Sequence, residues 1–106
     1  MTASPSPSPL LRPMEATLDG YAWLPRMIDK SRANARGTLG SIVHPCPVDK
    51  RCLERLGISF STFTEIVAAS ATDGEVLVRL RRHGVASPGE QWFDAVAYEY
   101  ELQRAA

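Results

Sequence analysis

The sequence predicts an all-α protein: one compact domain of about five short helices, the last of them the longest, after a disordered leader rich in serine and proline. Apolar residues recur at spacings of three and four along successive segments, and glycine, proline and capping residues separate those segments. No segment shows the sustained alternation of a strand. With 106 residues the chain suits one domain rather than two. We assign residues 1–17 to the leader and residues 18–106 to the helical domain.

The composition excludes several classes of protein. The formal net charge is zero and 44% of the residues are hydrophobic, which disfavours a nucleic-acid binder and a fully disordered chain. No apolar run approaches the roughly 20 residues that span a bilayer, and no secretory signal is evident, so we expect no membrane association. Two cysteines cannot build a disulfide-rich scaffold. These features indicate a cytoplasmic protein with reduced thiols.

The leader contains a strict alternation of serine and proline over residues 4–9. Proline fixes φ and removes backbone donors, and serine adds nothing to a core, so an extended, solvated segment is expected. A proline-rich ligand for a partner domain is the alternative, which Leu10 and Arg12 support only faintly.

The first helix is expected over 25–36, with Pro25 at a position where its missing N–H costs nothing and Gly37 as a left-handed cap. One face is apolar and the other is charged. We expect Leu24, Met27, Ile28, Ser31 and Ala35 to face the core, and Arg26, Asp29, Lys30, Arg32 and Arg36 to face solvent.

The second helix is expected to begin at Pro47, after a loop broken by proline and glycine, and to end at Leu56 before Gly57. Its apolar stripe includes Cys52, which we place in the core. Asp49 near the start and Arg55 near the end both suit the helix dipole.

Capping residues mark the remaining three helices. Ser59 is an N-cap, and Thr72 with Glu75 forms a capping box before a helix that ends at Gly84. A second capping box over residues 87–90 begins the last helix, which continues to about residue 104. The residues expected to form its buried face are Trp92, Phe93, Val96 and Tyr100.

The loop over residues 44–49 is the most unusual stretch, because it combines His44, Cys46 and Asp49. A structural zinc site would need four ligands at tighter spacing, so we expect no metal. Cys–His catalysis would need the imidazole within hydrogen-bond reach of the sulfur, which a loop before a helix N-terminus allows. The simplest interpretation is a proline-stiffened loop holding a small buried cysteine.

Charge is distributed unevenly along the chain. Residues 20–56 hold seven basic and three acidic side chains, whereas residues 84–106 hold four acidic and one basic. This asymmetry indicates either an anion-binding face or two regions that neutralise each other. Asp29 lies at the border of the charged face, so we expect the first helix and the 44–49 loop to meet in one polar junction. The candidate binding residues are Arg26, Asp29, Lys30, Arg32, His44, Cys46 and Asp49.

Cofactor motifs are missing from the sequence. It contains no phosphate-binding loop, dinucleotide fingerprint, HExxH motif or EF-hand loop. We therefore expect no cofactor.

Much of the chain resembles a small bacterial family known as domain of unknown function 5069. The resemblance rests on residues 20–21, 24–33, 37–40, 45–49 and 56–58, on the helix start within 70–80, and on Trp92. It implies a compact cytoplasmic helical protein and supplies no catalytic residues. The leader and the tyrosine-rich end, Tyr98 and Tyr100, lie outside the resemblance.

Two functions from different classes follow. The first is a non-enzymatic helical module that binds a protein partner or a small anionic ligand. The alternative is a small enzyme or anion-binding protein whose site joins the first helix, at Arg26, Asp29 and Lys30, to the 44–49 loop. A concave pocket at that junction would favour the second, and a flat apolar patch the first.

Overall fold

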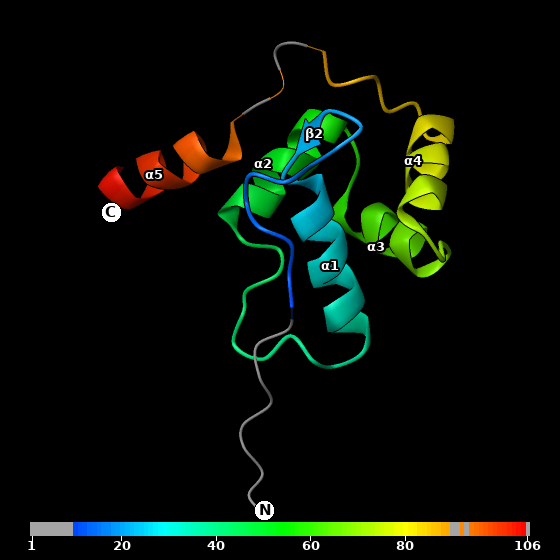
Figure 1. Ribbon diagram of the computed structural model, residues 1–106, viewed down its shortest axis with the longest axis horizontal. Coiled ribbons are helices and arrows are strands. Elements are labelled where there is room, and N and C mark those ends of the chain that lie inside the picture. Colours follow the sequence, from blue (N-terminus) through cyan, green and yellow to red (C-terminus); the bar gives the residue numbers. More distant parts are fainter. Residues whose placement is uncertain (1–9, 90–91, 93, 106) are drawn as a thin grey trace, which may run out of the picture.

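The computed structural model describes residues 10–89, 92 and 94–105. Within them five helices follow a short β-hairpin (Figure 1). The fold is therefore mostly helical, and the expectation of a strictly all-α chain is corrected by the hairpin. The elements are β1 (Thr17–Leu18), β2 (Tyr21–Ala22), α1 (Leu24–Ala35), α2 (Pro47–Leu56), α3 (Phe60–Ala68), α4 (Asp73–Arg82) and α5 (Ala95–Ala105).

The β-hairpin was missed because each strand has only two residues, too few to show alternation. Its strands are antiparallel, with Leu18 opposite Tyr21. Asp19 and Gly20 form the turn with φ of +51° and +88°, the left-handed conformation that two-residue hairpins need. A Cβ on Gly20 would lie 2.9 Å from Cγ of Pro88, so the segment after α4 packs tightly against this turn.

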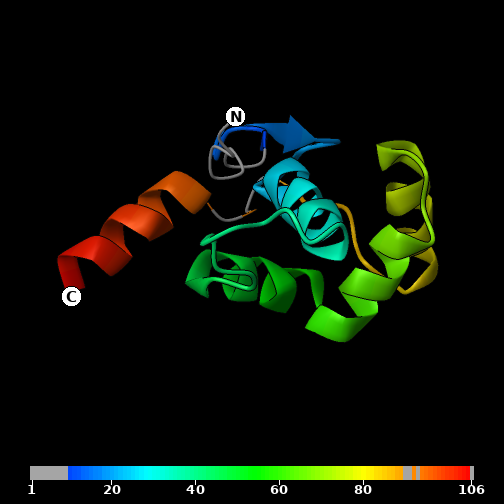
Figure 2. The same ribbon diagram turned by 90° about the horizontal axis from the view of Figure 1, so that it is seen from below.

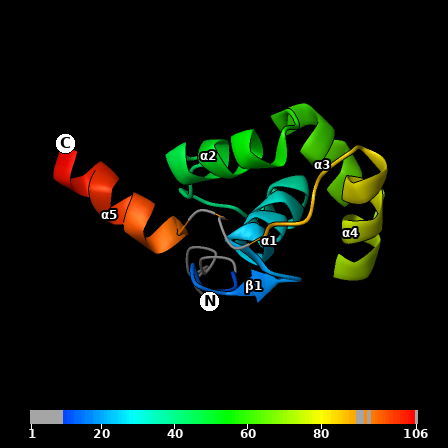
Figure 3. The ribbon, with the colours of Figure 1, turned by 90° about the horizontal axis from the view of Figure 1, so that it is seen from above.

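α1 lies at the centre of the fold and packs against the hairpin and α3. α2 packs against α3, and α3 against α4. Figures 2 and 3 show α4 and α5 at opposite ends of the molecule, with α5 projecting beside α2. The core lies between these elements, and its largest fully buried side chains include Tyr21, Phe63, Leu24, Met27 and Ile28.

The helix starts follow the capping chemistry. Cys46 and Thr72 each form a capping box with the acidic residue three positions on, and Ser59 accepts a hydrogen bond from the backbone of Thr62. The predicted range of α2 is confirmed at both ends. These side chains satisfy backbone N–H groups that would otherwise lack partners.

Two expectations about α1 are corrected. Lys30 was placed on the solvent face but is 2% exposed, because its ammonium reaches a buried carboxylate described below. Ala35 was placed in the core but is exposed, since it is the last residue of α1 and borders the open cavity between α1 and α3.

The last helix differs most from expectation. It begins at Ala95 rather than after Pro88, and its 11 residues make it shorter than the 12-residue α1, so it is not the longest described helix. Val96 and Tyr100 are 45% and 64% exposed, because the helix turns Ala95, Tyr98 and Leu102 toward the core instead. Glu90 and Phe93 lie outside the described residues, as does the Ser/Pro segment.

Some residues assigned to the leader contact the helices and the hairpin. Thr17 belongs to β1, and Arg12 is held by side chains of α1 and α4. Arg12 and Thr17 therefore belong to the folded body, whereas Leu10 is 98% exposed.

Candidate functional site

A buried polar cluster joins α1 to the loop before α2, and Asp49 is at its centre. We call Trp23, Lys30, His44, Cys46 and Asp49 the Asp49 cluster. Asp49 is the third residue of α2, so its carboxylate points back over the helix start and accepts the backbone N–H of Cys46 at 2.9 Å. The sulfur of Cys46 in turn accepts the backbone N–H of Asp49 at 3.4 Å.

Three further donors converge on the Asp49 carboxylate. The Lys30 ammonium lies 2.5 Å from Oδ2, Nδ1 of His44 lies 3.0 Å from the same oxygen, and the Trp23 indole donates to Oδ1 at 2.8 Å. Trp23 adopts a left-handed φ of +75° just before α1. Such a conformation costs roughly 1–3 kcal/mol, which the indole bond and the burial of the ring offset.

The cluster is closed to solvent. The side chains of Lys30, His44 and Asp49 are 3%, 0% and 0% exposed. Burial by itself would raise the pKa of Asp49, but the hydrogen bonds from His44, Lys30 and the Cys46 backbone outweigh it and hold the pKa well below its usual range. Asp49 is therefore a fixed carboxylate whose charge the surrounding donors balance.

His44 has the geometry of an oriented base but lacks an accessible face. Its Nδ1 contacts Asp49, its ring packs edge-on against Phe60, and its buried Nε2 has no hydrogen-bond partner. A reacting group must come within hydrogen-bond distance of a general base. With the imidazole fully covered, this arrangement joins elements of the fold rather than offering a reactive surface.

A second polar network surrounds Arg12. Its guanidinium binds Asp29 through Nε and Nη2, each at 2.9 Å, and binds Asp73 at the start of α4 at 2.6 Å. These hydrogen bonds raise the pKa of Arg12 and, as the largest cause, lower that of Asp73. Arg32 reaches Asp73 more weakly, at 3.3 Å. The network ties the N-terminal segment to α1 and α4.

A surface cavity of about 240 Å³ lies between α1 and α3. We call it the α1–α3 cavity. Its polar lining consists of the guanidinium groups of Arg32 and Arg36 and three hydroxyl side chains, and no carboxylate lines it among the described residues. Nη2 of Arg32 and Oγ1 of Thr64 are buried without a partner. Buried polar atoms in native proteins normally have partners, so these two atoms, in residues that line the cavity, are unsatisfied in this structure.

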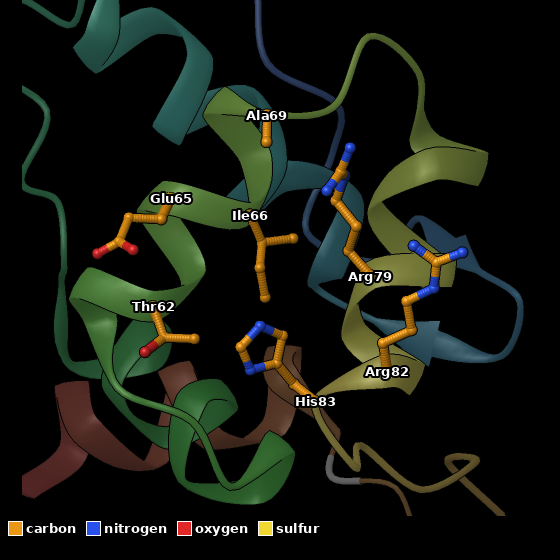
Figure 4. Close-up of a pocket in the computed structure, with 7 residues that line it drawn as sticks. All are labelled: Thr62, Glu65, Ile66, Ala69, Arg79, Arg82 and His83. Atoms are coloured by element: carbon orange, nitrogen blue, oxygen red, sulfur yellow. The ribbon is translucent and has the colours of Figure 1, made fainter.

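A second cavity, of about 230 Å³, lies between α3 and α4 (Figure 4). Ile66 and the His83 ring point into it, and Arg79 and Arg82 lie along its α4 side. Glu65 points away from the arginines toward the opposite edge. The last turn of α4 thus lines this hollow with cationic groups, beside an apolar floor.

The structure divides the predicted site residues into two groups. Lys30, His44, Cys46 and Asp49 meet in the Asp49 cluster, so α1 and the 44–49 loop do form one polar junction. Arg26, Asp29 and Arg32 lie elsewhere, in or beside the Arg12 network. The expected role of Asp29 at the junction is corrected, because its carboxylate faces Arg12 and Lys30 takes its place.

Sequence reasoning missed several contributors. Trp23 and Arg12 were assigned no partner, and the only available signals were an indole N–H beside a helix start and a lone arginine after a proline run. Thr64 gave no signal at all, because a hydroxyl in a helix is ordinarily solvated or bonded to its own backbone.

Both cysteines are free thiols. Cys52 is buried and unpaired, and burial is the main cause of its raised pKa, with the charge of Asp49 adding to it. Cys46 is unpaired and half-buried.

Across residues 10–89, 92 and 94–105, no cluster of three His, Cys, Asp or Glu side chains could hold a metal ion. In the same residues no helix has the length and apolar character to cross a membrane.

One protein-family model matches most of the chain. Residues 8–103 match the model of a domain of unknown function, DUF5069, which covers the hairpin, α1 to α4, most of α5 and both polar networks. The chain therefore belongs to the DUF5069 family, as the resemblance indicated. No curated protein matches the chain. The family has no assigned activity, so function must be argued from the cavities and clusters themselves.

Proposed function

We propose that this protein is a non-enzymatic binding module that takes a small anion in the α1–α3 cavity. The observation that carries the proposal is the polar lining of that cavity, which is cationic or hydroxyl-bearing, with two buried atoms that lack partners, Nη2 of Arg32 and Oγ1 of Thr64. An anion in the cavity would satisfy both atoms once the two side chains turned toward it, and charge-assisted hydrogen bonds are the stronger kind.

The charges around the cavity support an anion over other ligands. Asp73 occupies only Nη1 of Arg32, at 3.3 Å, which leaves Nη2 for a ligand. Arg36, one turn further along α1, forms no ion pair with any described residue. Both arginines lie near the C-terminus of α1, where the helix dipole favours cations. The dipole alone does not explain why a hollow lies between them or why one of their donors has no partner. The apolar wall, with Ala35 and Val67, accommodates an organic part of the ligand.

The experiment is a calorimetric titration of the full chain with inorganic phosphate and with sulfate at constant ionic strength. We expect saturable binding that weakens about tenfold in Arg36→Gln, as the loss of one hydrogen bond to a charged group would cause. Lys50→Gln is the matched control, because Lys50 is exposed, unpaired in the described residues and distant in the fold on α2. Absence of saturable heat, or equal weakening in both variants, would contradict the proposal.

The alternative, an enzyme acting at the junction of α1 and the 44–49 loop, stays a prediction. The His44–Asp49 pair and the unpartnered Nε2 of His44 are what favour it. Because these side chains are covered, a substrate would reach them only after the loop opened. The cytoplasmic and bacterial setting expected from the sequence also stays a prediction, with which the two unpaired thiols agree.

A further inference from the structure

We infer that the groove beside α4 binds helix α5 of a second copy of this chain. The groove consists of two hollows that share Arg79 and Arg82: the α3–α4 cavity of about 230 Å³ and a neighbouring hollow of about 500 Å³ along the exposed side of α4. Val78, which is 48% exposed, lies in the second hollow, and Ile66 forms the floor of the first. The groove thus has one large apolar side chain in each hollow, Ile66 and Val78, and two arginines that both hollows share, with Glu65 and Glu75 at its edges.

The cations in this groove have no partner within the described part of the chain. Arg79 and Arg82 take part in no ion pair there, whereas Arg81 on the other side of α4 binds Asp19. Glu75, at the edge of the second hollow, is occupied by the backbone N–H groups of Ala71 and Thr72. The two arginines are therefore available for acidic or aromatic groups of a partner.

The outward face of α5 has the complementary chemistry. Tyr100 is 64% exposed and Val96, four residues earlier on the same face, is 45% exposed. Tyr100 is the one aromatic side chain among the described residues that is classed as exposed. Glu99, three residues after Val96, is the carboxylate beside this face, whereas Glu101 borders a hollow that includes Arg51 of α2. A tyrosine ring beside arginine guanidinium groups gains both apolar burial and a cation–π contact.

A contact between the groove and α5 must join two molecules. In Figures 1, 2 and 3 α4 and α5 lie at opposite ends of the molecule, whose longest extent is 49 Å. The helices match in length, since 10 and 11 residues at about 1.5 Å each give about 15 and 16 Å. Each copy offers one groove and one helix, so the contact joins two different surfaces, and it either closes reciprocally in a dimer or continues from copy to copy.

The test is the oligomeric state of the full chain, measured by sedimentation over a range of concentrations. We expect the average mass to rise above the 11.6 kDa of the monomer as concentration increases. Tyr100→Ser and the double variant Arg79→Glu, Arg82→Glu should each shift this rise to at least tenfold higher concentration. Val43→Ser is the matched control, because Val43 is also 64% exposed but lies outside both surfaces, and it should associate as the wild type does.

Mixing the two variants distinguishes this contact from others. The Tyr100→Ser chain keeps an intact groove, and the double variant keeps an intact α5, so an equimolar mixture should associate more strongly than either variant alone. Circular dichroism of each variant checks that the helices persist. A wild-type chain that stays monomeric throughout would overturn the inference. Association that is lost in Tyr100→Ser but kept in the double variant would also overturn it, because α5 would then contact a surface other than the groove.

Discussion

The ammonium nitrogen of Lys30 on α1 lies 2.5 Å from Oδ2 of Asp49 on α2, and the two side chains are 3% and 0% exposed. A buried ion pair contributes little net stability compared with an apolar pair of the same volume. Removing one partner is different, because it leaves the other charge buried and uncompensated. The pair therefore makes the contact between α1 and the start of α2 specific and sensitive to substitution.

Asp49→Ala should destabilise the protein strongly. The substitution leaves the Lys30 ammonium and the Trp23 indole buried without their acceptor, and it removes the carboxylate that accepts the Cys46 backbone N–H in the capping box of α2. We expect a loss of about 3–5 kcal/mol in the free energy of unfolding, measured by urea denaturation. Glu54→Ala on the same helix is the control, since its ion pair with Arg51 is exposed and should contribute less than about 1 kcal/mol. Equal losses would refute the special role of the buried pair.

Stability should fall on acidification partly through Asp49. Its pKa in the folded protein is lower than the ordinary value of about 3.9, so the unfolded chain binds a proton first as the pH falls. This contribution is fully present above about pH 5 and is lost progressively below about pH 4. Asp49→Asn cannot titrate, so the stability difference between wild type and variant should narrow from pH 7 to pH 3. Asp73, whose pKa is also lowered, is common to both proteins and does not affect the difference. A constant difference across this range would contradict the assignment.

The sequence predicted the helices well where local chemistry determines them. The caps at Ser59 and Thr72 and the two ends of α2 follow from side chains next to the backbone groups they satisfy. The last helix was placed wrongly because Pro88 and Gly89 also fit an extended connection. In the structure that connection packs on the hairpin, where the Tyr21 hydroxyl donates to the carbonyl of Ala86.

The polar clusters could be predicted only in part. The expectation that α1 and the 44–49 loop meet rested on Asp29 at the border of the charged face, but the contact is made by Lys30 instead. Lys30 and Asp29 are adjacent in sequence, and helical periodicity places both near the border of the apolar face. Which of them turns inward depends on Arg12 and Asp49, which lie 17 and 19 residues away from their partners. No local pattern contains such long-range pairs.

Arg12 should contribute to stability although it follows a proline-rich segment. Its guanidinium and backbone N–H bind Asp29, and its guanidinium also binds Asp73. Arg12→Gln should lower the melting temperature by several degrees, as a loss of about 1–3 kcal/mol would in a domain of this size. Leu10→Gln is a nearby control, because Leu10 is 98% exposed and its replacement should have no effect. If both variants melt like the wild type, Arg12 does not hold the N-terminal segment in solution.

The two thiols should differ in reactivity. Cys52 is 0% exposed, and burial together with the nearby Asp49 charge raises its pKa, so little thiolate forms at neutral pH. Cys46 is half-buried at the start of α2 and should react first. A thiol reagent added to native protein should therefore modify at most one cysteine rapidly, and Cys46→Ser should abolish that fast phase. Two fast thiols, or a disulfide between residues 46 and 52, would contradict the structure.

Thr64 offers a test in which stability and binding move in opposite directions. Its hydroxyl is buried without a partner in a residue that lines the α1–α3 cavity, and an unsatisfied buried polar group costs about 1–3 kcal/mol. Thr64→Val keeps the branched shape and removes only the hydroxyl. The variant should therefore melt at the same temperature as the wild type or a few degrees higher, measured by calorimetry. In the phosphate titration it should bind more weakly, because the anion loses a donor.

Thr62→Val on the same helix is the matched control. The Thr62 hydroxyl accepts a hydrogen bond from Ser59 at 2.9 Å and lines the α3–α4 cavity instead. Its loss should lower the melting temperature slightly and leave phosphate binding unchanged. A hydroxyl with only a structural role at residue 64 would give the reverse pattern, a less stable Thr64→Val that binds phosphate like the wild type. The melting temperature is thus expected to stay the same or rise in Thr64→Val and to fall in Thr62→Val. This difference separates a ligand-binding hydroxyl from a structural one on the same nine-residue helix, α3.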